Sequence, residues 1–151
     1  MSTSQDNFVS DYDLIRNIIA QVAIAIDRHD WSSLKHIFTA DAVFDFPAPI
    51  GAHNGLLSLQ QALQDGLRGS VTQHSLGTQT IDRVGRTAKA TTYVTTLLVE
   101  PGKDDRKTHT MFGTYEDELV KEELNGHGSW RITKRKASNS AHLINNATFL
   151  G

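Results

Sequence analysis

The stretch VTQHSLGTQTI, residues 71–81, marks the point where the pattern of the chain changes. Before it, apolar residues recur at helical spacing; from here on, long segments alternate as strands do. Because successive strand side chains point to opposite faces, one face should carry Thr72, His74, Leu76, Thr78 and Thr80. An imidazole that shares a face with a leucine is either a buried histidine with satisfied hydrogen bonds or a catalytic base.

Helices are expected before this stretch. The spacing of apolar residues predicts a first helix over residues 11–28, a short second helix over 31–38 and a third over 56–67. Residues 42–46 alternate as a strand, and 47–55 (PAPIGAHNG) are typical of a loop.

Long strands are expected after the helices, over residues 70–83, 86–100, 106–121 and 129–137. Helices followed by a mostly antiparallel sheet predict an α+β fold. Three helices can cover only one face of a strongly curved sheet, so its concave side should enclose a small-molecule pocket. We expect residues 1–8 to form a flexible arm and 9–151 a single domain.

Composition excludes several classes of protein. The 151 residues carry a net charge of −2, with basic residues clustered only mildly at 131–136, so we expect no nucleic-acid partner. The lack of cysteine excludes disulfides, thiolate metal sites and cysteine nucleophiles. The seven histidines form no metal-binding pair and no phosphate-binding loop is present, so we expect no metal and no cofactor. Without a signal peptide or a membrane-length apolar run, a cytoplasmic location is expected.

Asp27 is unusual in its place. Ala20, Ala23 and Ile24 precede it at helical spacing, so its carboxylate should lie along an apolar stripe. It also lies near a helix C-terminus, where the helix dipole disfavours negative charge. Either Asp27 ends the helix or caps its neighbour, or it accepts a hydrogen bond from His74. In the second case we expect a carboxylate oxygen within about 3.2 Å of a ring nitrogen, an arrangement that orients a general base.

Four segments together resemble one family, namely residues 23–46, 72–81, 112–120 and 128–134. They look like the SnoaL-like branch of the NTF2-like superfamily, over about residues 9–137. The resemblance implies a cone-shaped α+β barrel in which a curved sheet encloses a pocket and which often dimerises through the sheet.

The spacing of D-x-x-D-W, residues 27–31, and T-Q-H, residues 72–74, is similar to that of the scytalone dehydratases. The hexachlorocyclohexane dehydrochlorinases carry a comparable pair. In both, the resemblance implies that the aspartate, here Asp27, orients a histidine, here His74, which removes a proton from a substrate carbon. Arg135 falls near an arginine that assists the departing anion in the dehydrochlorinases.

Other positions depart from these enzymes. Ile26 and Phe46 stand where the dehydratases have two tyrosines, Leu98 where they have a second histidine, and Gly113 and Tyr115 where they have a serine and an asparagine. Val22 replaces a lysine of the dehydrochlorinases. The Asp–His pair of these enzymes is thus present in this chain, whereas their electrophilic groups are not. The resemblance therefore implies a substrate different from theirs.

Alternation gives further pocket candidates, because His109, Met111, Gly113, Tyr115 and Asp117 should share a face. Tyr115 could donate a hydrogen bond to an oxyanion, or pack in a core or a dimer surface. His109 could line the pocket or be solvated, and Arg135 could meet an anionic substrate or be a solvated edge charge. The substrate-binding candidates are Tyr115, Arg135, His109, Met111, Phe46 and Leu98.

These residues predict a cofactor-independent dehydratase, isomerase or cyclase with His74 as base and Asp27 as its orienter, acting on an apolar polycyclic or polyketide-like metabolite of secondary metabolism. A non-catalytic module that binds a small ligand or a partner is the alternative, and epoxide hydrolysis by Asp27 and Asp117 is a third possibility. The apolar, threonine-rich segment 91–99 predicts a homodimer that packs sheet on sheet.

Overall fold

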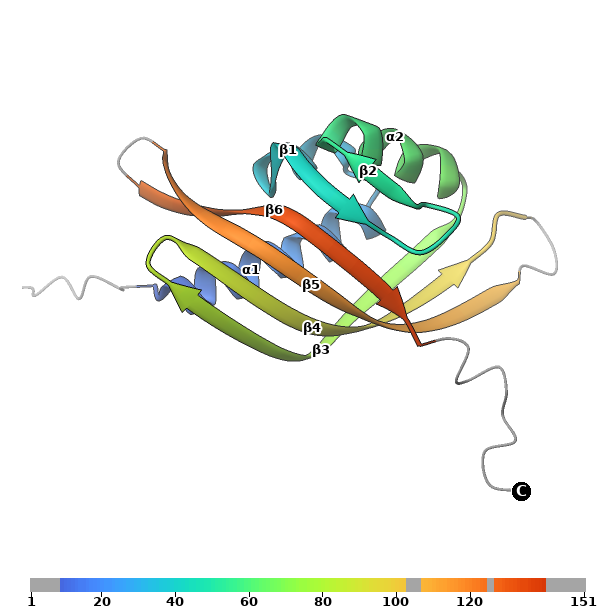
Figure 1. The fold of residues 1–151 in the computed structure, drawn as a ribbon. Coiled ribbons are helices and arrows are strands. Elements are labelled where there is room, and N and C mark those ends of the chain that lie inside the picture. Colours follow the sequence, from blue (N-terminus) through green and yellow to red (C-terminus); the bar gives the residue numbers. More distant parts are fainter. Residues whose placement is uncertain (1–8, 103–106, 125–126, 141–151) are drawn as a thin grey trace, which may run out of the picture.

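The computed structural model describes residues 9–102, 107–124 and 127–140; the predicted arm, residues 1–8, and residues 141–151 lie outside them (Figure 1). The fold is α+β, as predicted, with the helices in the first half of the chain and a curved sheet. The elements in chain order are α1 (Asp11–Asp27), the 3₁₀ helix η1 (Trp31–His36), β1 (Phe38–Asp45), β2 (Ala52–Asn54), α2 (Leu56–Gly66), β3 (Val71–Val84), β4 (Thr87–Val99), β5 (Thr108–Leu124) and β6 (His127–Asn139).

Helix α1 begins and ends at residues whose chemistry explains its length. The Ser10 hydroxyl accepts a hydrogen bond from the backbone N–H of Asp13, which caps the first turn. After the last residue, His29 adopts a positive φ of 54°, which cannot continue a right-handed helix. The next helix is shorter than predicted: it ends at His36, because Phe38 already pairs with Ile132 in the sheet.

The six strands form one sheet in the order β2-β1-β6-β5-β4-β3. All neighbours are antiparallel except β1 and β6, which run parallel. The sheet is curved but open, because β2 and β3 form its edges and no ladder joins them, so the predicted barrel is not closed. Strand β2 lies inside residues 47–55, predicted as a loop, where its three residues pair with the end of β1.

Bulges bend three strand pairs and change which residues face inward. In β3 the register shifts between Leu76 and Gln79, so Gln79 and Ile81 are partly buried and Thr78 and Thr80 are exposed. The predicted single face from Thr72 to Thr80 is therefore wrong beyond Leu76, because the bulge adds a residue. A similar shift in β6 lies between Ile132 and Lys134, and the β1–β6 pairing shifts between Phe38 and Val43.

The inner face of the sheet, turned toward α1, has two halves. One half packs as a hydrophobic core against α1, which crosses behind the strands in Figure 1, while α2 packs on β1 and β2. The other half lines a cavity between the sheet, α2 and the β1–β2 loop. The core residues of the sheet and of α1 include Ile15, Ile19, Val22, Phe38, Phe44, Ala88, Ala90, Leu119, Trp130 and Ile132.

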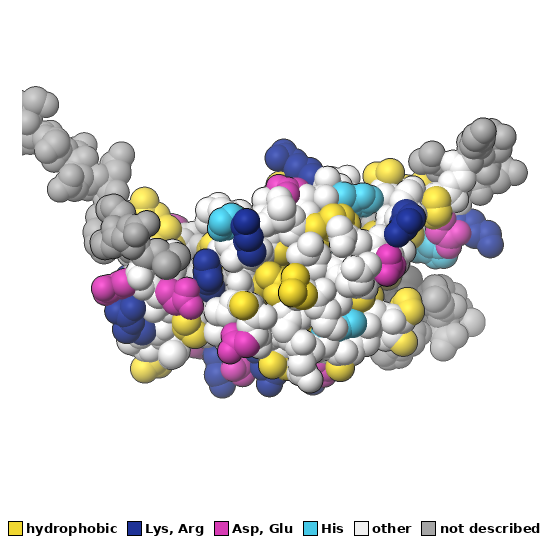
Figure 2. All heavy atoms as spheres, turned by 90° about the horizontal axis from the view of Figure 1, so that it is seen from above, with side chains coloured by type: hydrophobic (Ala, Val, Ile, Leu, Met, Phe, Trp, Pro, Cys, Tyr) yellow, Lys and Arg dark blue, Asp and Glu magenta, His cyan; other side chains and the backbone are white. Residues whose placement is uncertain are grey.

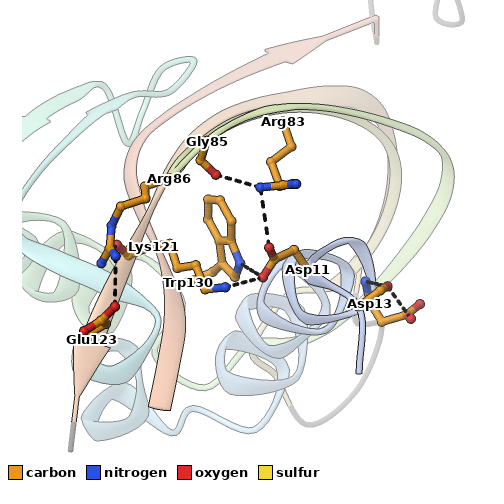
Figure 3. Close-up of polar contacts among 9 residues, drawn as sticks. Asp11, Asp13, Arg83, Gly85, Arg86, Lys121, Glu123 and Trp130 are labelled. Atoms are coloured by element: carbon orange, nitrogen blue, oxygen red, sulfur yellow. Dashed lines mark hydrogen bonds and ion pairs between the residues drawn. The ribbon is translucent and has the colours of Figure 1, made fainter. Parts of the chain in front are cut away.

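Asp11 joins the first turn of α1 to three strands at the core end (Figure 3). Its Oδ1 accepts hydrogen bonds from Lys121 Nζ at 2.8 Å and Trp130 Nε1 at 3.0 Å, and its Oδ2 lies 3.6 Å from Arg83 Nη1. The hydrogen bonds from Lys121 and then Trp130 lower the pKa of Asp11 below its ordinary value of 3.8. The negative charge also suits the positive end of the helix dipole.

Charged groups of both signs are intermixed on the face seen from the side of α2 in Figure 2. Among the helices of the described residues, none is both long enough and apolar enough to cross a bilayer.

We expect the substitution Asp11→Asn to destabilise the fold at neutral pH by about 1 kcal/mol, because the amide keeps an acceptor but loses the charge that Lys121 and Arg83 meet. A lowered carboxyl pKa gives stability that is present above pH 3.8 and is lost as the pH falls through the pKa of the folded state. Urea denaturation of both proteins between pH 7 and pH ~2.5 should therefore show the difference shrinking at low pH.

Asp13→Asn is the matched control, since Asp13 lies in the same turn, is exposed and bonds to Ser10. A difference between wild type and Asp11→Asn that stays constant over this pH range would contradict the charged role of Asp11.

Candidate active site

The predicted contact between Asp27 and His74 is present. Nδ1 of His74 lies 2.6 Å from Oδ1 of Asp27, and the exposed fractions of the two side chains are 10% and 18%. Because Nδ1 faces the carboxylate, Nε2 is the ring nitrogen left for other partners; within the described residues, no protein group hydrogen-bonds to it. His74 lines the cavity, and Asp27 lies behind it, outside the lining.

The carboxylate of Asp27 also accepts two hydrogen bonds that sequence reasoning missed. The Thr72 hydroxyl donates to Oδ1 at 2.8 Å, and the backbone N–H of His74 donates to Oδ2 at 2.9 Å. The strand pattern contained a signal, since Thr72 shares a face with His74. Ile24 is half-exposed, so Asp27 lies at the edge of the buried stripe of α1 rather than within it.

The cavity has a volume of about 240 Å³ and an apolar lining with a few polar groups. The predicted residues Phe46, Leu98, Met111 and Tyr115 line it, as do Ile26 and Gly113. Residues 47–50 of the β1–β2 loop and the C-terminal half of α2 complete the wall. The polar side chains of the lining are those of Thr72, His74, Thr96, Tyr115 and Asn139.

Arg135 does not line the cavity, and it is not the solvated edge charge considered above. It is 2% exposed, with Nε 2.7 Å from Oδ1 of Asp117 and Nη2 2.9 Å from Oδ2. Burial disfavours the guanidinium charge, but the adjacent Asp117 carboxylate outweighs burial and raises the pKa of Arg135. The reason is register: Arg135 of β6 faces Asp117 of β5, toward the core half of the sheet. Asp117 is thereby paired with Arg135 on the core side, which argues against epoxide hydrolysis by Asp27 and Asp117.

His109 lies outside the cavity, contrary to its place among the substrate-binding candidates. It is exposed near the start of β5, and its Nε2 lies 2.6 Å from Glu100 Oε1. It shares the alternation of β5 with Met111, which lines the cavity, but lies two residues nearer the start of the strand and outside the lining. Val22 is buried in the core, not in the cavity.

The site is suited to proton transfer. A histidine oriented through one nitrogen by a carboxylate presents the other nitrogen to an apolar space where substrate can be held without water. No group of three His, Asp or Glu side chains that could hold a metal ion lies among the residues that the structure describes.

Gly113 lines the cavity at a point where β6 approaches it closely. A Cβ atom at this position would lie 2.6 Å from the backbone oxygen of Ser138, well inside van der Waals contact. We expect Gly113→Ala to destabilise the fold by about 1–3 kcal/mol, since two paired strands must separate locally. Thermal or urea denaturation measures the effect.

The matched control is Gly77→Ala in β3, where a Cβ atom would meet its nearest neighbour, the oxygen of Tyr93, at 3.8 Å. Its change in stability should stay within about 0.5 kcal/mol. Equal losses in the two variants would show that the approach of β6 does not constrain position 113.

A family model described as SnoaL-like domain matches residues 7–136. Among curated proteins, none matches the chain.

Solved structures share the fold at low identity. The protein Kfla4162 of Kribbella flavida has a TM-score of 0.75 and 18% identity, and the match covers 89% of this chain and 97% of that one. A protein of Novosphingobium aromaticivorans with the provisional name scytalone dehydratase gives 0.72 and 19%, over 86% and 84%. A hexachlorocyclohexane dehydrochlorinase, LinA type 2, gives 0.72 and 16%, over 85% and 84%. At these identities the likeness shows that the fold is shared and nothing more.

Proposed function

We propose that this chain, which belongs to the SnoaL-like domain family, is a cofactor-independent lyase or isomerase in which His74 is the general base and acid. The observation that carries the proposal is the 2.6 Å contact between Asp27 and Nδ1 of His74, with the ring on the wall of an apolar cavity. The names of two structural neighbours, a dehydratase and a dehydrochlorinase, agree with elimination chemistry.

In the proposed reaction, Nε2 of His74 takes a proton from a substrate carbon next to a carbonyl or a hydroxyl-bearing carbon. Asp27 stabilises the imidazolium that forms. In a dehydration, the electron pair forms a double bond while the hydroxyl leaves as water with a proton from the imidazolium. In an isomerisation or cyclisation, the proton returns to another atom of the substrate. A positioned base contributes about 10²–10⁴-fold, so positioning in the cavity must supply the rest.

The cavity favours an uncharged, compact and mostly apolar substrate. Besides the His74 ring, its polar side chains are hydroxyls and one amide, and the nearby cation, Arg135, is already paired with Asp117. A carboxylate or phosphate would find no unpaired cation among the described lining residues, and burying an unpaired charge is costly. Hydroxylated or carbonyl-bearing polycyclic or polyketide-like metabolites, as in secondary metabolism, fit this polarity.

The alternative is a module that binds a small ligand without transforming it. The same cavity supports it, because an apolar pocket with few polar groups is typical of binding sites as well. The state of His74 distinguishes the two: an oriented base is needed for turnover and not for binding.

We expect His74→Ala to reduce turnover at least 100-fold, because no other base of the described residues lines the cavity. Asp27→Asn should reduce it as well, because an amide does not stabilise the imidazolium. The assay incubates uncharged hydroxylated and carbonyl-bearing polycyclic compounds in D₂O. Mass spectrometry then reads loss of water and uptake of deuterium at carbon, so that proton abstraction is detected even without net conversion.

His109→Gln is the control, since His109 is exposed and outside the cavity. It should leave turnover unchanged. If His74→Ala and Asp27→Asn still exchange and convert a substrate at the wild-type rate, the pair is structural and the protein is not this enzyme. If wild type binds the compounds without exchange or conversion, the binding module is the better account.

We further propose that two copies associate through the outer face of the sheet. Tyr93, Leu97 and Phe112 are exposed there on β4 and β5, with exposed fractions of 57%, 38% and 42%. A shallow groove between them is lined mainly by small residues, among them Ser75, Gly77 and Thr114. Such a face is a candidate interface rather than an ordinary solvated surface.

Phe112→Asp should convert the expected dimer to a monomer, because a charge would be buried at the interface. Sedimentation velocity at micromolar concentration measures the mass. The control is Leu57→Asp on α2, where the wild-type leucine is 81% exposed and lies away from the outer face. A wild-type protein that sediments as a monomer would contradict the proposal.

A further inference from the structure

The ring of Tyr115 packs against the guanidinium of Arg135, a buried cation. The Cζ atom of Arg135 lies 4.2 Å from the centroid of the Tyr115 ring and 5.8 Å from that of Phe38. The two nitrogens that bond Asp117 hold the guanidinium in a fixed orientation beneath the phenol ring. Tyr115 and Asp117 lie two residues apart on the same face of β5, so register places all three side chains together.

This cluster lies at the boundary between the two halves of the inner face. Tyr115 faces the cavity, whereas Asp117 and Arg135 are buried on the side of the core. A buried ion pair is a poor way to stabilise a core, because apolar residues of similar size often do so better. The contact between the Arg135 cation and the face of the Tyr115 ring therefore points to a role beyond packing.

Several charges act on the phenol. Burial raises the pKa of Tyr115, the Arg135 cation opposes this, and the carboxylates of Asp117 and Asp27 add to it. A side-chain hydrogen bond with Thr96 of β4 also lowers the pKa. His74 of β3 is a further titratable group on the cavity wall. At neutral pH the phenol keeps its proton and is a donor, and a cation on the ring face strengthens that donor.

We propose that Arg135 is a positioning residue that acts through Tyr115, holding and polarising the phenol so that its O–H stabilises the substrate oxygen on which negative charge develops. This rests on the proposed function. As Nε2 of His74 takes the carbon-bound proton, the electron pair of the broken C–H bond moves toward the carbonyl oxygen. That oxygen accepts a hydrogen bond from Tyr115, which keeps its proton throughout. Arg135 itself touches no substrate.

The phenol can be titrated without any substrate. The chain has three tyrosines, and Tyr12 is exposed on α1, away from the proposed interface, so it serves as the internal reference when all three carry ¹³C at Cζ. NMR spectra across pH give each pKa, and Tyr115→Phe assigns the Tyr115 signal. We expect Arg135→Gln to raise the pKa of Tyr115 by about one unit or more and Asp117→Asn to lower it. Shifts of opposite sign distinguish charge coupling from loosened packing.

A second variant covers the case in which Arg135→Gln does not fold, because it leaves Asp117 without its partner. Arg135→Met combined with Asp117→Leu replaces the pair by apolar residues of similar size, a change that folds often tolerate. The pKa of Tyr115 should rise in this double variant, by less than in Arg135→Gln. An unchanged pKa in every folded variant would overturn the coupling.

The donor role is tested with 4-nitroacetophenone, an uncharged ketone whose carbonyl oxygen accepts the hydrogen bond, followed by its absorbance. Tyr115→Phe and the double variant should each weaken its binding about 5-fold or more, and 4-nitrotoluene, which lacks the carbonyl, should bind with little change. Failure of the wild-type protein to bind 4-nitroacetophenone, or equal binding by Tyr115→Phe, would overturn the proposal. Neither result depends on turnover, so loss of the proposed enzyme activity and loss of this inference are separate outcomes.

Discussion

The carboxylate of Asp27 is the interaction on which the site depends. It accepts hydrogen bonds from the Thr72 hydroxyl, the His74 backbone and the His74 ring, and so ties the last residue of α1 to β3. The helix dipole disfavours a negative charge at this end, and the three donors offset that cost. Asp11 ties the first residue of α1 to β3, β5 and β6 in the same way. With both ends fixed, α1 cannot slide over the sheet without breaking the orientation of His74.

The inner face of the sheet serves two purposes that conflict. A core needs dense apolar packing, whereas a binding site needs empty space with a few polar groups. The strands separate the core and the binding site along their length. At one end their inward residues, among them Ala88, Leu119 and Trp130, pack in the core, and at the other end their inward residues line the cavity. Tyr115 lines the cavity, and the buried Asp117–Arg135 pair lies between it and the core.

The proposed function separates the base from the groups that select its substrate. In the proposed enzyme Asp27 and His74 supply the base, but a base alone does not select a substrate. That selection is proposed to come from the other polar groups of the lining, which are Tyr115, Thr96, Asn139 and Thr72 among apolar residues. Tyr115, whose ring packs against the paired Arg135, differs from an unpaired arginine in the cavity lining. The tyrosine can donate a hydrogen bond without attracting an anion.

The sequence by itself determined the α+β class and the order of the helices and long strands, because periodicity is a local signal. For Asp27 it left two alternatives, a helix end or cap and a contact with His74, and the structure shows the contact. Only the tertiary structure decided which residues of β3 face inward after Leu76, since a bulge is fixed by pairing with β4. The tertiary structure also places His109 outside the cavity, beside Glu100, and pairs Arg135 with Asp117. Strand alternation predicts which residues share a face of the sheet. Cross-strand register and the packing of the helices decide whether that face lines a cavity, joins the core or meets solvent.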